Sequence, residues 1–386
     1  SGTSMSAPQV AGGSALVMEY LEKHDSYKDF SKEEKSRLAK VLLMNTANIL
    51  ENPNSGTPYS PRKQGAGVMN LADATTALTR VVNNANDLAK VELKELDDTS
   101  FEFELKVIND SDKDIEYKVD IDVLADKIIS DEEGQEYISL DSRRVKFISD
   151  TPETITVAAG EEEVFTVKVD FSEDEDIYRN MFIEGFVTLK DTTDSSPKLS
   201  VPYVGFYGDW SEPSVLDGMK YIDEKSYYGF AGMIDADFYY YEKISMSPGT
   251  EWGYWFGTDT LIPVLSFMRN AEEIQYNILD EDGNKLRTLA IDEYVRKHYF
   301  DSGRQGNPYS LTLDRMWDGT VKGKPVEDGL YYYEIKSKLN FDGGEQVVRY
   351  PIYIDTQEPV VEDVKYDTDT NILSFKVTDG EQSSGL

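Results

Sequence analysis

The sequence contains no cysteine and only two histidines among its 386 residues. The absence of cysteine excludes disulfide bonds, thiolate metal sites and a cysteine nucleophile. Basic side chains are also scarce, because 39 Lys and Arg stand against 73 Asp and Glu, and the formal net charge is −34. Such an acidic chain is a poor partner for nucleic acid or an anionic membrane surface. We find no apolar run of membrane length, no signal peptide and no lipidation motif.

The first residues place a serine, Ser4, directly before an apolar segment. Residues 7 to 18 are almost all apolar or small, which predicts a helix buried on all sides. At the start of a helix, free backbone N–H groups and the helix dipole favour negative charge, so an oxyanion formed beside the Ser4 hydroxyl would be stabilised. The ordinary alternative is that Ser4 is an N-cap, because serine is a preferred capping residue.

The string Gly-Thr-Ser-Met-Ser-Ala-Pro around Ser4 makes this position more specific. It closely resembles the nucleophile motif of the subtilases, the subtilisin-like serine proteases, whose usual form is Gly-Thr-Ser-Met-Ala-x-Pro-x-Val-Ala-Gly. Ser6 and Ala7 replace the usual order of alanine and a small residue. The resemblance implies that Ser4 is the catalytic nucleophile and that its own N–H is one oxyanion donor. It also implies that Gly2 and Thr3 lie at the substrate, with the Thr3 hydroxyl close to the oxyanion hole.

Two later segments resemble the same family in the same order. Residues 35 to 47 are predicted to form a helix whose start is a capping box of Ser31 and Glu34, and this helix is similar to a late subtilase helix that ends in Asn-Thr-Ala. Residues 64 to 70, followed by an expected short helix from Leu71 to Val82, are similar to the closing segment of the catalytic domain. We therefore predict that residues 1–86 are the C-terminal part of a subtilisin-like α/β domain.

The family's catalytic order is Asp, His, Ser, so the resemblance places the general base, its orienting acid and the oxyanion Asn before Ser4. His24 cannot replace the base, because it lies roughly 30 Å from Ser4 along the first helix. His298 is expected to be a surface residue of another domain. We therefore predict that this chain alone has no peptidase turnover, and that its partner is a missing N-terminal part of the catalytic domain carrying Asp, His and Asn.

From Val91 onward the helical pattern gives way to alternation of apolar and charged residues. Residues 101–107, 117–123, 155–157, 165–169, 183–189 and 199–203 belong to about seven expected strands, which predict one β-sandwich over residues 87–206. This region resembles the fibronectin type III-like domain of bacterial cell-envelope proteinases. Residues 91–200 contain 31 acidic and 12 basic side chains. A solvated outer face explains this excess, and an acidic docking surface is the alternative.

Residues 207–358 resemble a second fibronectin type III-like sandwich. Its clearest element is a hairpin from Ile274 to Thr288 that turns through Asp282-Gly283. Residues 359–386 are expected to be the truncated start of a third sandwich. The predicted fold is therefore multidomain, with a helical subtilase part followed by all-β sandwiches. The resemblance implies an extracellular protein associated with the cell wall of a Gram-positive bacterium.

Two other groups of residues invite a binding role. Asp110, Asp112 and Asp114 alternate as calcium ligands can, but they lack the usual glycine and bidentate acid, so we prefer a polar turn and expect no cofactor, with calcium as the alternative. The aromatic run from Tyr227 to Phe256 is interpreted as packing between sandwiches, or else as an exosite.

Two functions are consistent with the sequence. The first is a serine endopeptidase of the subtilisin type that cleaves extracellular proteins through an acyl-enzyme at Ser4, with the sandwiches as accessory domains. The alternative is a non-catalytic adhesive or structural surface module. An intact nucleophile motif favours the protease.

Overall fold

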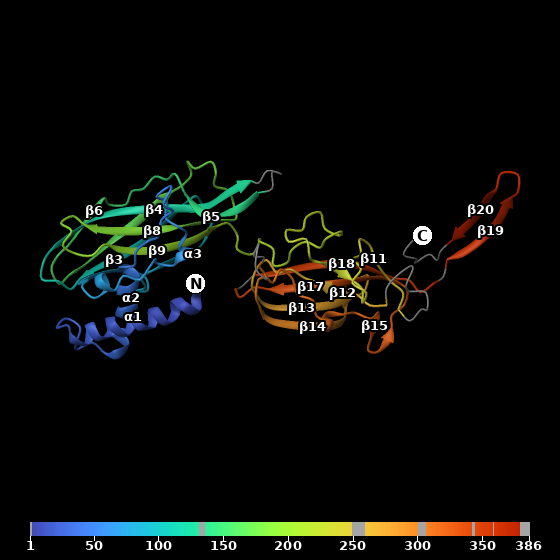
Figure 1. Ribbon diagram of the computed structural model, residues 1–386, viewed down its shortest axis with the longest axis horizontal. Helices are drawn as coiled ribbons and strands as arrows, with labels where there is room; N and C mark the ends of the chain where they lie inside the picture. Colours follow the sequence, from blue (N-terminus) through green and yellow to red (C-terminus); the bar gives the residue numbers. More distant parts are fainter. Residues whose placement is uncertain are drawn as a thin grey trace. The chain divides into compact units, whose positions relative to one another are not determined.

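The computed structural model describes residues 2–130, 136–248, 259–299, 306–341, 344–357 and 359–378. The chain divides into two compact units, Ser1–Trp210 and Ser211–Leu386 (Figure 1). The predicted boundary between residues 86 and 87 lies inside the first unit, which contains the helices and a complete sandwich. No helix of the described residues is long and apolar enough to cross a membrane.

Four helices open the first unit: α1 (Thr3–Lys23), α2 (Lys32–Asn45), α3 (Pro61–Gln64) and α4 (Leu71–Ala74). The capping box predicted for α2 is present, since the Glu34 N–H donates to Ser31 Oγ (3.2 Å) and the Ser31 N–H donates to Glu34 Oε2 (2.7 Å). Helices α1, α2 and α4 share a small core that includes Val17, Leu38 and Ala74. This core holds the C-terminal half of α1 against α2.

The helix predicted from Leu71 to Val82 is wrong beyond Ala74. Residues 79–83 instead form the strand β1 (Thr79–Asn83), which pairs antiparallel with β3 (Ser100–Asn109). The segment contains β-branched Thr79, Val81 and Val82, which favour a strand. Tertiary pairing therefore overrides the helical spacing and joins the helical part to the sandwich.

The prediction that α1 is buried on all sides is also wrong. Only Gly13, Val17 and Leu21 are buried, whereas Met5, Val10 and Leu16 are 58%, 48% and 52% exposed. At Gly13 a Cβ would lie 2.3 Å from Met69 Sδ, so a larger residue there would displace the Met69 side chain. The N-terminal half of α1 thus presents apolar side chains that no described residue covers.

Two sheets form the sandwich of the first unit. One has the order β1-β3-β7, and the other has the order β2-β9-β8-β4-β5 with β6 also paired to β4. The remaining strands are β2 (Val91–Leu96), β4 (Ile115–Ser130), β5 (Glu136–Arg144), β6 (Thr154–Val157), β7 (Glu162–Asp170), β8 (Met181–Asp191) and β9 (Leu199–Tyr207). All the strands predicted by alternation are confirmed, and their inward residues, such as Leu105, Val167 and Val187, are fully buried.

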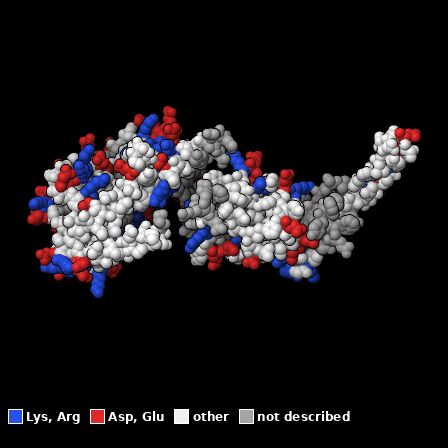
Figure 2. Space-filling view, viewed as in Figure 1, with Lys and Arg blue, Asp and Glu red and all other residues white. Residues whose placement is uncertain are grey.

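Charges of both signs are interspersed on the visible face of the first unit (Figure 2). Exposed pairs across neighbouring strands, such as Lys168 with Glu102 (3.1 Å), contribute to this pattern. Interspersed charge fits the solvated outer face that we prefer for this acidic region.

The second unit is built on a five-stranded sheet of order β11-β18-β17-β13-β14. The predicted hairpin is confirmed as β13 (Ala271–Leu279) and β14 (Lys285–Val295), with Gly283 at φ 82° in the turn. Trp317 is fully buried in the core of this unit. The other elements are β10 (Gly232–Ile234), β11 (Ile244–Met246), β12 (Ile262–Val264), η1 (Leu313–Arg315), β15 (Thr320–Val321), β16 (Lys324–Pro325), β17 (Gly329–Lys338), β18 (Glu345–Ile354) and the hairpin β19 (Val360–Asp367) with β20 (Ile372–Thr378).

Candidate active site

Ser4 lies in the first turn of α1 with its side chain exposed to solvent. The N-cap of α1 is Gly2 (φ 145°, ψ 167°), and no side chain caps the helix. The N-cap interpretation of Ser4 is therefore wrong, because Ser4 is already the second helical residue. Its hydroxyl satisfies no backbone donor of the helix and remains available for other chemistry.

The helix start also presents free backbone donors beside Ser4. The N–H groups of Met5 and Ser6 donate to the Gly2 carbonyl oxygen at 2.9 and 3.2 Å. Those of Thr3 and Ser4 have no hydrogen-bond partner among the described residues. Two unpaired N–H groups at the positive end of a 21-residue helix attract negative charge. Gly2 and Thr3, the predicted substrate-binding residues, are both exposed at this position.

The surroundings of the two histidines differ. His24 is the C-cap residue of α1, at the far end of the helix from Ser4, and its Nδ1 accepts the Ser26 N–H (3.3 Å). His298 belongs to the second unit and is buried, with 7% of its surface exposed, so the expected surface position is wrong. Its Nδ1 accepts the Phe267 N–H (2.9 Å), and burial, together with the charge of Arg315, lowers the pKa of His298. Tertiary packing between segments distant in sequence causes this burial, which local composition does not indicate.

A buried amide in the closing turn of α2 attaches the helical part to the sandwich. Asn45 is fully buried, and its Nδ2 donates to the carbonyl oxygens of Val81 (2.9 Å) and Ser200 (3.1 Å). Its Oδ1 accepts the Val81 N–H (2.9 Å). One side chain therefore connects α2 to β1 and to β9, two strands of different sheets. The sequence marked this residue only as part of an Asn-Thr-Ala string.

A charged cluster forms a second attachment, and the sequence gives no local signal for it. Arg62 Nε and Nη2 donate to the two oxygens of Glu184 at 3.1 and 3.0 Å, and Nη2 also donates to Asp126 Oδ1 (2.8 Å). Its guanidinium carbon lies 3.8 Å from the centre of the Phe182 ring. Burial opposes the charge of Arg62, but the bonds to Glu184 and Asp126 outweigh it and raise the pKa of Arg62.

Two of the aspartates considered as calcium ligands bond to protein groups. Asp110 accepts the Tyr27 hydroxyl (3.0 Å) and is paired with Arg80, and Asp114 accepts the Ala159 N–H (2.9 Å). Burial, followed by the charge of Asp110 and its bond, raises the pKa of Tyr27. The described ranges contain no group of three or more His, Asp or Glu placed to hold a metal ion. Asp110 thereby ties the segment after α1 to the sandwich, and calcium binding by the three aspartates stays the alternative.

The aromatic run is only partly described, since Trp252, Tyr254, Trp255 and Phe256 lie outside the described residues. Tyr227, Phe238 and Tyr239 are 60%, 66% and 70% exposed. They are therefore outside the core of their own unit. Both interpretations of the run, packing between sandwiches and an exosite, stay predictions.

Comparison with known proteins connects these observations. Residues 1–67 match the model of the subtilase family, and residues 91–204 match the model of an Fn3-like domain. The C5a peptidase of Streptococcus pyogenes serotype M6 is 28% identical over 94% of this chain and 36% of that protein. The PI-type proteinase of Lactococcus lactis subsp. cremoris is 28% identical over 94% of this chain and 21% of that protein.

The chain spans about a third or less of the curated relatives that it matches. Among solved structures, the periplasmic chaperone SfaE aligns with 71% of this chain and 98% of that chain at 10% identity and a TM-score of 0.22, which is too low to carry an argument. The fold class predicted from the sequence is confirmed as a subtilase part followed by β-sandwiches. Residues 1–67 thus match the subtilase family, in a chain that is similar over 94% of its length to bacterial proteins named C5a peptidase and PI-type proteinase.

Proposed function

We propose that Ser4 is the nucleophile of a subtilisin-type serine endopeptidase that cleaves extracellular protein substrates. The Ser4 oxygen would attack the peptide carbonyl while a general base takes the hydroxyl proton. The protonated base would then give this proton to the departing amine as the peptide C–N bond breaks, which leaves an acyl-enzyme that water hydrolyses. The Ser4 N–H would stabilise the oxyanion, with the Thr3 hydroxyl close by, and Gly2 would lie along the substrate.

The observation that supports this proposal best is the state of the helix start. Ser4 is exposed, it does not cap α1, and two neighbouring N–H groups have no partner among the described residues. An oxyanion is stabilised by donors that are already fixed where the charge develops. A serine with a merely structural role would instead use its hydroxyl to satisfy one of these donors.

We further propose that the general base, its orienting acid and the oxyanion Asn come from a polypeptide segment outside this sequence. Met5, Val10 and Leu16 of α1 are each about half exposed, so the helix offers apolar side chains on which such a segment would pack. Burial of exposed apolar side chains favours association. Without that segment the Ser4 hydroxyl is a weak nucleophile, and the chain alone is expected to be inactive.

An active-site fluorophosphonate tests both statements. We expect no labelling of the 386-residue chain alone, and stoichiometric labelling of Ser4 when the chain is produced together with the preceding catalytic segment of a subtilase relative. The label should be lost in Ser4→Ala and retained in Ser6→Ala, which matches the more usual alanine of the motif.

The outcomes separate the two statements. Stoichiometric labelling of Ser4 in the chain alone would refute the inactivity of the fragment. If Ser4→Ala retained the label in the combined protein, the nucleophile assignment would be refuted. An intact combined protein that takes no label and cleaves no peptide would favour the non-catalytic surface module.

The compartment is part of the proposal. The relatives include a C5a peptidase from Streptococcus and PI-type and PII-type proteinases from lactic acid bacteria. A chain without cysteine and with a net charge of −34 suits an extracellular protein attached to the wall of a Gram-positive bacterium. Immunogold labelling of intact cells tests this location.

A further inference from the structure

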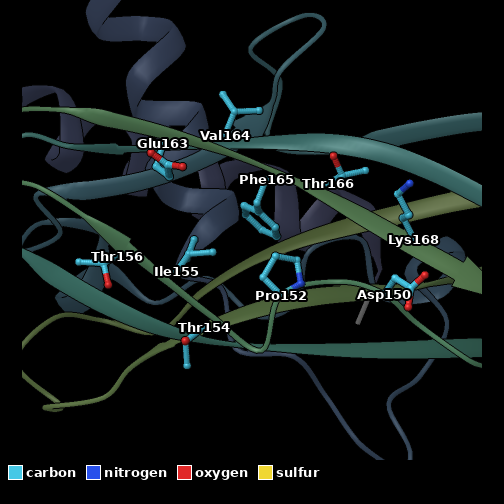
Figure 3. Close-up of a pocket in the computed structure, with 10 residues that line it drawn as sticks. All are labelled: Asp150, Pro152, Thr154, Ile155, Thr156, Glu163, Val164, Phe165, Thr166 and Lys168. Atoms are coloured by element: carbon cyan, nitrogen blue, oxygen red, sulfur yellow. The ribbon is translucent and has the colours of Figure 1, made fainter.

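Two open strand edges, one from each sheet of the first unit, flank a groove of about 520 Å³. Strand β7 is the last strand of its sheet, and β6 pairs only with β4. Figure 3 shows residues of both strands around the groove, with Pro152, Ile155 and Phe165 between them. Ile155 and Phe165 are buried, so they form an apolar floor below the two edges.

The outer edge of β7 is partly covered and partly open. On the side away from β3, Asp170 of β7 and Ile148 donate their backbone N–H groups to each other's carbonyl oxygens. On the same side, the Lys168 N–H donates to Thr151 Oγ1 (2.9 Å). No register shift interrupts the pairing of β7 with β3, so the even-numbered residues all direct their backbone groups outward. The outward groups of Val164 and Thr166 have no hydrogen-bond partner among the described residues.

The same reasoning applies to β6. The Val119 N–H donates to the Glu153 carbonyl oxygen, so the odd-numbered residues of this segment face β4. Thr154 and Thr156 therefore direct their backbone groups toward the groove, where both residues form part of its lining. An extended chain in the groove would meet unpaired N–H and C=O groups of the kind that a further strand requires.

The rim of the groove is acidic. Glu161, Glu162 and Glu163 precede and begin β7, and all three are exposed. Asp150 and Glu163 are in the lining itself. The single basic residue of the lining, Lys168, forms an ion pair with Glu102 (3.1 Å). The rim therefore carries an excess of negative charge, which attracts a basic ligand and opposes edge-to-edge pairing with a second acidic copy of this chain.

We propose that this groove binds an extended, basic polypeptide segment, which pairs as an added strand with the free edge of β7. Backbone groups of Val164 and Thr166 would pair with the segment. Its alternate side chains would contact the Ile155 and Phe165 floor on one face and reach the acidic rim on the other, because successive side chains of a strand point to opposite faces. The inference is independent of the proposed chemistry of Ser4.

The test uses a fluorescein-labelled octapeptide of alternating lysine and valine with the full 386-residue chain, and fluorescence anisotropy is measured at low salt. Thr166→Pro removes the outward N–H but leaves the bonds from β7 to β3, because residue 166 points away from β3. We expect this change to weaken binding about fivefold, as the loss of one main-chain hydrogen bond of about 1 kcal/mol implies. The matched control Thr166→Val keeps the N–H and should bind like the parent chain.

A charge variant and an exchange measurement complete the test and do not depend on the fold of Thr166→Pro. The pair of changes Glu162→Lys and Glu163→Lys should weaken the lysine peptide about tenfold and strengthen a glutamate-valine peptide. Hydrogen exchange should show new protection of peptide segments covering residues 162–168 when the lysine peptide is bound. No binding below about 1 mM, or binding without this protection, would overturn the proposal. If the chain forms dimers and Thr166→Pro abolishes them, the proposal is overturned in favour of a second copy of this chain as the occupant of the groove.

Discussion

Removal of the Arg62 side chain should loosen the attachment between the helical part and the sandwich. Arg62 follows Pro61 at the start of α3, whereas Glu184 and Asp126 lie on β8 and β4. The side chains of Glu184 and Asp126 are 0% and 8% exposed, and Arg62 is the cation that pairs with both. Arg62→Met keeps much of the side-chain volume but leaves two buried carboxylates without that partner.

The expected cost is about 3–5 kcal/mol in the free energy of unfolding of the first unit, which is typical when one partner of a buried ion pair is removed. Arg62→Lys should lose less, because it keeps the charge but gives up the two-pronged bond to Glu184 and the contact with the Phe182 ring. The double variant Arg62→Met with Glu184→Gln should recover part of the loss, since it removes one uncompensated charge.

Urea unfolding of the full chain, followed by hydrogen exchange and mass spectrometry of segments from β8 and α3, measures this cost separately for the first unit. The matched control is Arg37→Met, because Arg37 forms a pair with Glu33 whose side chains are 78% and 75% exposed. Such an exposed pair should contribute at most about 0.5 kcal/mol. If Arg62→Met costs no more than Arg37→Met, the assignment of Arg62 as the attachment is refuted.

Three further changes test the remaining structure. Asn45→Ala should lower the free energy of unfolding in urea by about 3 kcal/mol, because it leaves backbone groups of β1 and β9 unpaired in the core. An unchanged urea midpoint would contradict this role of Asn45. Gly185→Ala should lower the free energy of unfolding by more than about 2 kcal/mol, because its Cβ would lie 1.8 Å from the Asp122 carbonyl oxygen. In the control Gly12→Ala, the new Cβ meets no atom within 4 Å, and the change should stabilise α1 by up to about 1 kcal/mol. The pKa of buried His298 is lowered in the folded state, so below about pH 6.5 the unfolded chain binds more protons than the folded chain. The second unit should therefore lose thermal stability as the pH falls through this range. Calorimetry should show a weaker pH dependence in His298→Gln.

The strands of the first sandwich could be predicted because each has one buried and one solvated face. In β3, for example, Phe101 and Leu105 point inward while Glu102 and Glu104 are exposed, so the burial of the fold appears directly as alternation in the sequence. Strand β5 lacks this signal: Ile138 and Leu140 are 61% and 81% exposed, and no buried face shapes their pattern. The helical prediction fails at β1 because its partner β3 begins 17 residues after β1 ends, so the pairing leaves no local signal.

The residues of the candidate site and its surroundings also fall into two groups, those with a local sequence signal and those without one. Ser4, Gly2 and Thr3 were identified from a local string, because chemistry at a helix start depends on a few consecutive residues. The residues that fix this helical part in place, Asn45 and Arg62, act on partners 36 to 155 positions away. A contact of that range leaves no periodic trace in the sequence. The same limit explains His298, which is buried by tertiary packing and whose Nδ1 accepts the N–H of Phe267, 31 positions before it.

The contacts between the helical part and the sandwich give a physical reason for a sandwich directly after the segment that carries Ser4. Helix α1 has few buried residues of its own, and it rests on α2 and α4 through a small core. That core is in turn fixed to β1 and β9 by Asn45 and to the segment after β3 by the bond between Tyr27 and Asp110. Arg62 fixes the neighbouring helix α3 to β4 and β8. A catalytic group must be held within a fraction of an ångström of its working position, and rigid elements achieve this better than loops. The first sandwich therefore supports the helix that carries the proposed nucleophile. If Ser4 has that role, disruption of Asn45 or Arg62 should lower the activity of the combined protein even though neither residue belongs to the proposed site.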